Sequence, residues 1–206
     1  MNLKNILKRK WAIGDVIKFG KCQQDTSAKN TPIEWIVLDI NNGTALLISK
    51  YCLLTTPYCD LQHLLWEDSV ARQLLNDSFF NDAFNEKEKV RIVMRDTVLD
   101  KKVPVSKDRV FLLTEDEVTT YMPTEESRRA LPTKKAIADG ARIDMEPKGN
   151  ACWWLLPYIE PFVDMNGNFS VYPKAVFQFG GIQYHSRNVY HSDFTIRPSI
   201  LVRLDG

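Results

Sequence analysis

The sequence predicts an α+β fold with an N-terminal β-hairpin, central short helices and an aromatic-rich C-terminal β lobe. β-rich runs open the chain at 13–50 and close it at 152–204, and capped helical patterns lie between them. Strands followed by helices and then strands favour α+β over an alternating βαβ order. A length of 206 residues predicts a single domain over 13–206 after a basic leader at 1–12.

The clearest local signal is a β-hairpin within 33–50, which follows a short predicted strand at 13–20. Its two β-rich runs flank Asn42-Gly43, a dipeptide that accepts the positive φ angles of a tight hairpin turn. Apolar residues occupy both faces of the first run. The hairpin is therefore expected to be central in its sheet.

A helix is predicted within 66–84, with Asp68 or Ser69 as its N-cap. Leu74 and Leu75 fall on one face, and the polar run 76–78 weakens the helix. Further caps predict three shorter helices: 85–92 from the Asn85/Glu88 capping box, 114–121 from Thr114 with Glu117, and 133–139 ending at Gly140.

Short strands account for most of the remaining signals. A buried strand is predicted at 110–113, and the C-terminal part contains three more β signals. These are a buried strand at 152–156, a hairpin at 161–172 turning at Asn166-Gly167, and a closing strand at 196–204.

Charge and hydropathy exclude several classes of protein. The 27 Lys and Arg residues nearly balance the 26 Asp and Glu residues, which argues against a nucleic-acid partner. The longest nearly apolar run, 151–159, is interrupted by Pro157 and is about half the length of a spanning helix, so no transmembrane segment is expected. Gly14 and Asp15 follow the basic leader where a secretory signal needs an apolar stretch, which predicts a cytoplasmic protein.

The four cysteines are too sparse for a disulfide scaffold, and no two of them have CxxC spacing. They are therefore interpreted as reduced thiols, with Cys52 and Cys59 as the only plausible local pair.

The composition changes over 153–194, which holds 11 of the 22 aromatic residues but only five charged ones. Large rings interspersed with Asn, Gln, Ser and Gly are typical of a binding surface. The alternative is that rings such as Trp153 and Phe177 form the core of a small β lobe. The segment 184–193 mixes polar groups too densely for a strand core, which favours a surface site.

We therefore predict a ligand surface whose rings stack on a sugar or an apolar side chain. Its predicted residues are Trp154, Tyr184, His185, Arg187, Asn188, Tyr190, His191 and Asp193. Arg197 is predicted to be a structural clamp that pairs with a buried carboxylate or carbonyl. Arg128-Arg129 is interpreted as a solvated helix end.

Several segments together resemble a known bacterial family over residues 13–205. They are GDVIKFG, PIEWIVLD, ALLISKY, WEDSVARQLLNDSFFNDAF, VFLLTEDEV, GNACWWLL and IRPSILVRL. This order resembles DUF6273, a domain of unknown function common in gut Firmicutes.

DUF6273 is distantly similar to the C-type-lectin-like fold, which formylglycine-generating enzymes also adopt. The resemblance implies a two-lobed α+β domain whose C-terminal loops present a ligand surface. Members usually continue the double Trp with Arg-Ser-Pro-Gly. Here Leu155, Leu156 and Pro157 stand instead, which removes a cation from the site.

The residues give little support to enzyme chemistry. The second half of the chain holds only Cys152, whereas a formylglycine-type oxygenase needs a reactive cysteine pair. No GxSxG elbow, P-loop or GxGxxG motif is present, so no catalytic residue, metal or cofactor is predicted. Two alternatives stay open: a metal-dependent enzyme distantly similar to formylglycine-generating or sulfoxide-synthase proteins, with a metal held by His185 and His191, and a protein-interaction domain with a large exposed aromatic patch.

Overall fold

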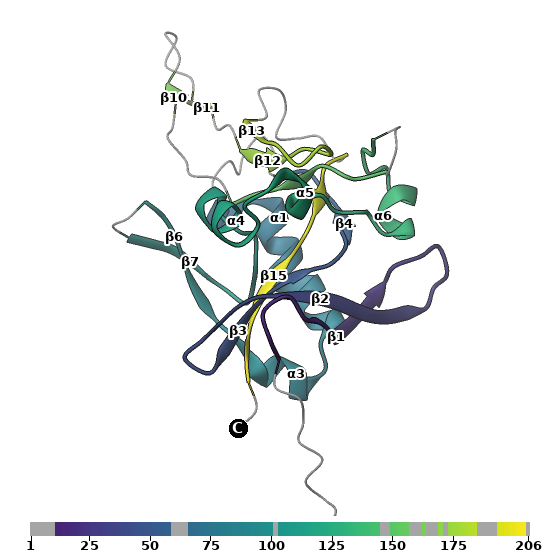
Figure 1. The fold of residues 1–206 in the computed structure, drawn as a ribbon, viewed down its shortest axis with the longest axis vertical. Coiled ribbons are helices and arrows are strands. Elements are labelled where there is room, and N and C mark those ends of the chain that lie inside the picture. Colours follow the sequence, from purple (N-terminus) through teal and green to yellow (C-terminus); the bar gives the residue numbers. More distant parts are fainter. Residues whose placement is uncertain are drawn as a thin grey trace, which may run out of the picture.

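Two antiparallel β-hairpins and two larger sheets dominate the computed structural model, and short helices cover both sides of the larger sheets (Figure 1). The fold is mixed α+β with mostly strands. The structure describes residues 11–58, 66–100, 103–144, 149–156, 162–163, 169–170, 173–184 and 193–204.

The first sheet has the strand order β1-β2-β3-β15-β5, and β8 also pairs with β15. All its pairings are antiparallel. The strands are β1 (Val16–Gln23), β2 (Asn30–Asn41), β3 (Thr44–Ser49), β5 (Ile92–Val93), β8 (Val110–Phe111) and β15 (Ser199–Arg203).

The predicted hairpin at 33–50 is confirmed as β2 and β3. Its turn residues Asn42 and Gly43 have φ angles of 48° and 73°, as the dipeptide requires. β2 lies between β1 and β3, and Trp35 is fully buried on one of its faces and Leu38 on the other. The hairpin is therefore central in its sheet, as its two apolar faces predict.

The second sheet has the strand order β13-β12-β9-β14-β4. Its strands are β4 (Leu54–Thr55), β9 (Trp153–Trp154), β12 (Lys174–Val176), β13 (Ile182–Tyr184) and β14 (Thr195–Ile196). The predicted closing strand at 196–204 is divided at Arg197-Pro198, because proline cannot continue a ladder. As a result, β14 belongs to the second sheet and β15 to the first.

Two hydrophobic cores lie on opposite sides of these sheets. Trp154 and Phe194 belong to the core that the helices at 70–83 cover, whereas Trp153 belongs to the other core. That second core includes Val118 of α4 (Glu115–Tyr121). The interpretation of Trp153 as a core residue is confirmed.

The helix predicted within 66–84 is a short 3-10 turn, η1 (Trp66–Asp68), followed by three helical pieces in succession. These are α1 (Val70–Leu74), a π-helical turn η2 (Leu75–Phe79) and α2 (Phe80–Ala83). Ser69 is the N-cap, and its hydroxyl accepts a hydrogen bond from the backbone N–H of Arg72. The π-helical turn falls on the polar run 76–78, where the sequence predicts a weakened helix.

The predicted capping boxes of α3 (Glu86–Arg91) and α4 are both present. Thr133 caps α6 (Lys134–Ala138), and Gly140 follows that helix with a φ of 99°. One short helix, α5 (Glu125–Arg128), has no counterpart in the sequence-based prediction.

Three further hairpins lie outside the larger sheets or at their edges. In the hairpin predicted at 161–172, β10 (Phe162–Val163) pairs with β11 (Phe169–Ser170), and its predicted turn lies outside the described residues. The hairpin of β6 (Arg95–Asp100) and β7 (Val103–Asp108) projects from the body in Figure 1 and was not predicted. The β12–β13 hairpin was not predicted either.

No helix in the described part of the chain combines the length and the apolar composition that a membrane span needs.

Candidate functional site

The predicted ligand surface is partly within the described structure. Tyr184 ends β13, and Asp193 resumes the described chain just before β14. The other predicted surface residues between these two, which lie outside the described residues, are His185, Arg187, Asn188, Tyr190 and His191. Only the two ends of the segment can therefore be located.

Tyr184 is an exposed aromatic residue at the edge of the second sheet. Its relative exposure is 62%, and β13 is the outermost strand in the sheet order. Lys174 is its cross-strand partner on β12, and the Lys174 ammonium lies 4.5 Å from the centre of the ring. The ring thus contacts a cation and remains largely open to solvent.

An ion pair holds that cation in place. Lys174 Nζ bonds to Glu115, the first residue of α4. Partial burial lowers the pKa of Lys174, but the hydrogen bond with Glu115 and the attraction of its charge outweigh burial and raise the pKa overall. The Lys174 ammonium therefore stays protonated beside the Tyr184 ring at neutral pH.

The β12–β13 hairpin is fixed at its turn by two arginines. Arg128 Nε donates to the carbonyl of Gly180 at 2.7 Å, and Arg129 Nε donates to that of Phe179 at 2.9 Å. Gly180 has a φ of 93°, and a Cβ there would lie 2.0 Å from the carbonyl oxygen of Glu125. The turn therefore packs directly on the backbone of α5.

The interpretation of Arg128-Arg129 as a solvated helix end is wrong for Arg128, which is 9% exposed. Its guanidinium donates to the carbonyls of Met122 and Pro123 as well as to Gly180. A guanidinium is buried here because several backbone carbonyls replace the water that it would otherwise bind.

Trp154 does not lie on the surface. Its relative exposure is 0%, and its ring stacks on Phe194 with 4.4 Å between centroids. The indole N–H donates to the carbonyl of Thr56 at 3.3 Å. Because β9 is the middle strand of its sheet, core residues cover both of its faces, and this ring contributes to packing.

Asp193 marks the other end of the predicted segment. Its backbone carbonyl accepts a hydrogen bond from the N–H of Arg142 at 2.7 Å. Its buried Oδ1 has no hydrogen-bond partner among the described residues.

The Cys152 thiol is a buried group in the same region. Its Sγ donates to Oε1 of Gln178 at 2.9 Å, and burial raises the pKa of this thiol to about 11. The thiol is therefore neutral near pH 7 and a poor nucleophile.

Arg197 joins the two sheets through backbone carbonyls. Its Nε donates to Ser49 at 2.9 Å, and a terminal nitrogen donates to Arg128 at 3.3 Å. The guanidinium also lies 5.2 Å from the centre of the Trp153 ring. Of the two partners expected for this residue, the structure contains the carbonyls. No ion pair of Arg197 with a carboxylate occurs among the described residues.

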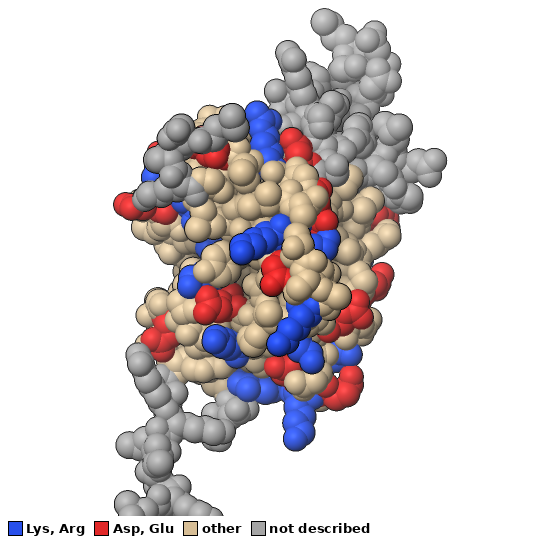
Figure 2. Space-filling model, turned by 90° about the vertical axis from the view of Figure 1, so that its right-hand side faces the viewer, with Lys and Arg blue, Asp and Glu red and all other residues tan. Residues whose placement is uncertain are grey.

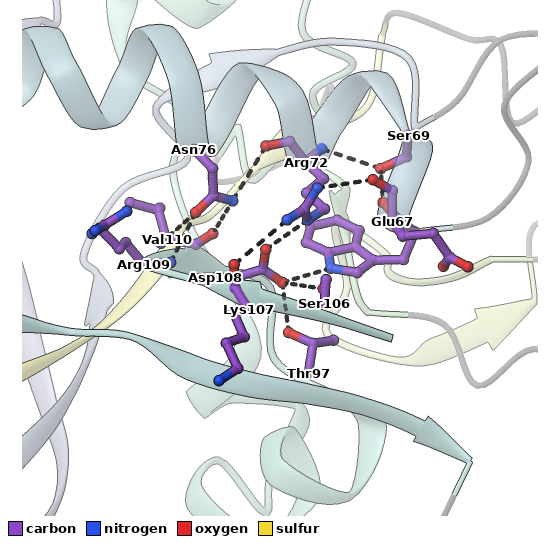
Figure 3. Close-up of polar contacts among 11 residues, drawn as sticks. Glu67, Ser69, Arg72, Asn76, Thr97, Ser106, Lys107, Asp108, Arg109 and Val110 are labelled. Carbon is purple, nitrogen blue, oxygen red and sulfur yellow. Dashed lines mark hydrogen bonds and ion pairs between the residues drawn. The ribbon is translucent and has the colours of Figure 1, made fainter. Parts of the chain in front are cut away.

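A buried polar cluster around Asp108 was missed by the sequence analysis (Figure 3). Asp108 has no exposed area, and its Oδ1 accepts from Arg72 Nε at 2.6 Å. Its Oδ2 accepts from Trp66 Nε1, Thr97 Oγ1 and Ser106 Oγ at distances of 2.6 to 2.9 Å.

The donors to Asp108 come from η1, α1, β6 and β7, so the cluster fixes the projecting hairpin to the helices. Asn76 extends the network, since its side chain bonds to the backbone of Arg109 and Val110 (Figure 3). The Asp108 carboxylate is fully occupied by protein donors, which makes it a structural group. Arg72 and Asp108 are 36 positions apart, and no local sequence pattern indicates that they are paired.

Metal binding has no support in the part of the chain that the structure describes, where no three His, Cys, Asp or Glu side chains are grouped to hold an ion. Cys22, Cys52 and Cys152 are free thiols. The histidine pair of the alternative metal hypothesis, His185 and His191, lies outside the described residues.

Comparison with known proteins assigns the chain to a family and gives no activity. The family model described as "Domain of unknown function (DUF6273)" matches residues 42–204, and the chain belongs to this family. No curated protein and no solved structure matches the chain.

Proposed function

We propose that the protein is a non-enzymatic ligand-binding domain, and that its binding surface is built on the β12–β13 hairpin and the segment 184–193. Tyr184 would stack on a sugar ring or an apolar side chain of a glycan, peptide or protein ligand. The observation that carries this proposal is the 62% exposure of Tyr184 on a hairpin that is otherwise tightly held.

Rigid support favours binding at this position. Arg128 and Arg129 bond to the turn of the hairpin, and the Lys174–Glu115 ion pair holds its open end to α4. A ring on a fixed platform loses little conformational entropy when a ligand packs on it. A lone aromatic residue on a mobile loop would lack this advantage.

The ion pair also provides polar recognition next to the ring. Lys174 and Glu115 supply hydrogen-bond donors and acceptors beside the apolar surface of Tyr184, a combination typical of small-ligand sites. Asp193, whose buried Oδ1 has no hydrogen-bond partner among the described residues, marks the opposite end of the segment 184–193. We further propose that the architecture is C-type-lectin-like, with this segment as its ligand loop.

The test is a binding screen of the purified chain against immobilised oligosaccharides, peptidoglycan fragments and peptides, with Tyr184→Ala beside the wild type. We expect a ligand whose affinity falls about tenfold or more in the variant, the effect of removing a central stacked ring. Phe179→Ala is the matched control, because it removes a 40% exposed ring at the other end of the same hairpin. Equal losses in both variants, or none in Tyr184→Ala, would contradict the proposal.

Metal analysis of the same preparation tests the enzyme alternative. Stoichiometric iron, copper or zinc that disappears in His185→Ala and His191→Ala would favour a metal-dependent enzyme over a binding domain. Capture of a protein partner through Tyr184, without any saturable small ligand, would favour the interaction-domain alternative.

A further inference from the structure

A hollow on another part of the molecule has the features of a small-molecule site. It has a volume of about 490 Å³ and lies between the end of β1, the α1–α2 stretch and α6. This volume is in the usual range for ligand pockets. Its lining includes the apolar side chains of Cys22, Leu54, Leu74, Phe79 and Ala83.

Cys22, the one titratable residue in this apolar part of the lining, is uncharged at physiological pH. Burial raises the pKa of the Cys22 thiol to about 12, so the group stays a neutral S–H at physiological pH. Phe79 is 6% exposed and belongs to the core that the helices cover. An apolar ligand group entering the hollow would therefore meet the outer surface of a packed core.

Charged residues stand on all three walls of the hollow. On α6, Lys135 bonds to Asp139 one helical turn further on, so these two charges neutralise each other. On the other two walls, Lys21 belongs to β1 and Asp82 to α2, and both are exposed. Neither forms an ion pair among the described residues.

Lys21, Asp82 and Ala83 also line a second hollow, of about 420 Å³. One basic and one acidic group are therefore shared by the two hollows. In Figure 2, which views the molecule from the side of α6 and the β1–β2 hairpin, Lys and Arg are interspersed with Asp and Glu. Mixed charges of this kind suit a ligand with no net charge.

We propose that the 490 Å³ hollow binds a small zwitterion with an apolar side chain, of the chemical class of the free apolar amino acids. The side chain packs against Leu54, Leu74 and Phe79. The carboxylate pairs with Lys21, and the ammonium pairs with Asp82. A ligand with only one of the two charges leaves the other protein charge without a partner.

Calorimetric titration with leucine tests the proposal, since two analogues each remove one charge. These analogues are 4-methylpentanoate, which lacks the ammonium, and 3-methylbutylamine, which lacks the carboxylate. We expect saturable leucine binding that is tighter than binding of either analogue. Lys21→Ala should weaken leucine binding about two- to fivefold and leave the amine unaffected, and Asp82→Asn should do the same for leucine and leave the carboxylate unaffected.

Two controls separate this site from the surface at Tyr184. Asp116→Asn, an exposed acid on α4, and Tyr184→Ala should both leave leucine binding unchanged. Absence of saturable leucine binding would overturn the proposal. So would equal affinities for leucine and both analogues, or leucine binding that neither Lys21→Ala nor Asp82→Asn weakens.

Discussion

Arg197 and Ser49 lie 148 positions apart in the chain, yet the Nε of the first donates to the carbonyl oxygen of the second at 2.9 Å. Ser49 ends β3 of the first sheet, and Arg197 follows β14 of the second. The bond therefore ties the two sheets together at the point where the chain passes between them. Arg197 is 2% exposed, and burial lowers its pKa to about 10, because the buried cation has lost its hydration by water.

We predict that Arg197→Lys destabilises the fold by about 2 kcal/mol although the charge is kept, because an ammonium does not reproduce the planar fork that reaches Ser49 and Arg128 together. Urea denaturation measures the change. Arg129→Lys is the control. Because Arg129 is exposed, this substitution should lower the free energy of unfolding by less than about 0.5 kcal/mol. Equal midpoints for the two variants would contradict a clamp role for Arg197.

Asp108→Asn should destabilise the fold by about 2 to 4 kcal/mol. In Asn an NH₂ group replaces one carboxylate oxygen, so a hydrogen-bond donor faces the donors that surround Asp108. Arg72 also loses its buried anionic partner. The exposed Asp96, which lies 3.8 Å from Lys107, provides the matched control, and Asp96→Asn should cost less than about 0.5 kcal/mol. A small loss of stability in Asp108→Asn would show that the cluster tolerates a neutral acceptor.

Gly180→Ala should cost more than Gly140→Ala, although both residues have positive φ angles, 93° and 99°. A Cβ at Gly140 meets nothing within 4 Å, so only backbone strain of about 1 kcal/mol is expected there. At Gly180 the Cβ meets the Glu125 carbonyl at 2.0 Å, so the hairpin must move away from α5. Thermal unfolding of both variants measures the difference, and similar melting temperatures would refute tight packing at this turn.

We expect the protein to lose stability at alkaline pH because of its buried thiols. Burial raises the pKa of Cys152 from the usual 9.0 to about 11, and the same cause raises that of Cys52 to about 11. Between pH 9 and 11 the folded state therefore keeps protons that the unfolded chain loses. Below pH 9 the stabilising contribution of each thiol is fully present. Between pH 9 and 11 that contribution to the free energy of unfolding should fall by about 1.4 kcal/mol per pH unit.

Urea denaturation at pH 8, 9 and 10 isolates the contribution of one thiol when wild type and Cys152→Ala are compared. The stability difference between them should shrink as the pH rises, because only the wild type loses the contribution of Cys152. Thr119→Ala, an exposed change without a titrating group, should follow the wild type at each pH. A constant difference between wild type and Cys152→Ala would contradict the raised pKa.

Elements with local signals can be predicted from the sequence alone. Asn42-Gly43 specifies a hairpin turn through backbone angles, and the Asn85/Glu88 and Thr114/Glu117 pairs specify helix starts through hydrogen bonds within four residues. The mixed α+β class follows from the order of these elements. Family membership also follows from the linear order of motifs.

Which aromatic and charged residues are buried depends on the tertiary structure. Composition alone does not distinguish Trp154 from Tyr184, but β9 is a middle strand and β13 an edge strand, so one ring is in the core and the other faces solvent. Arg128 and Asp108 are buried because carbonyls or donors from distant segments surround them. Such partners are brought together by chain topology, and no pattern within a short window of sequence contains them.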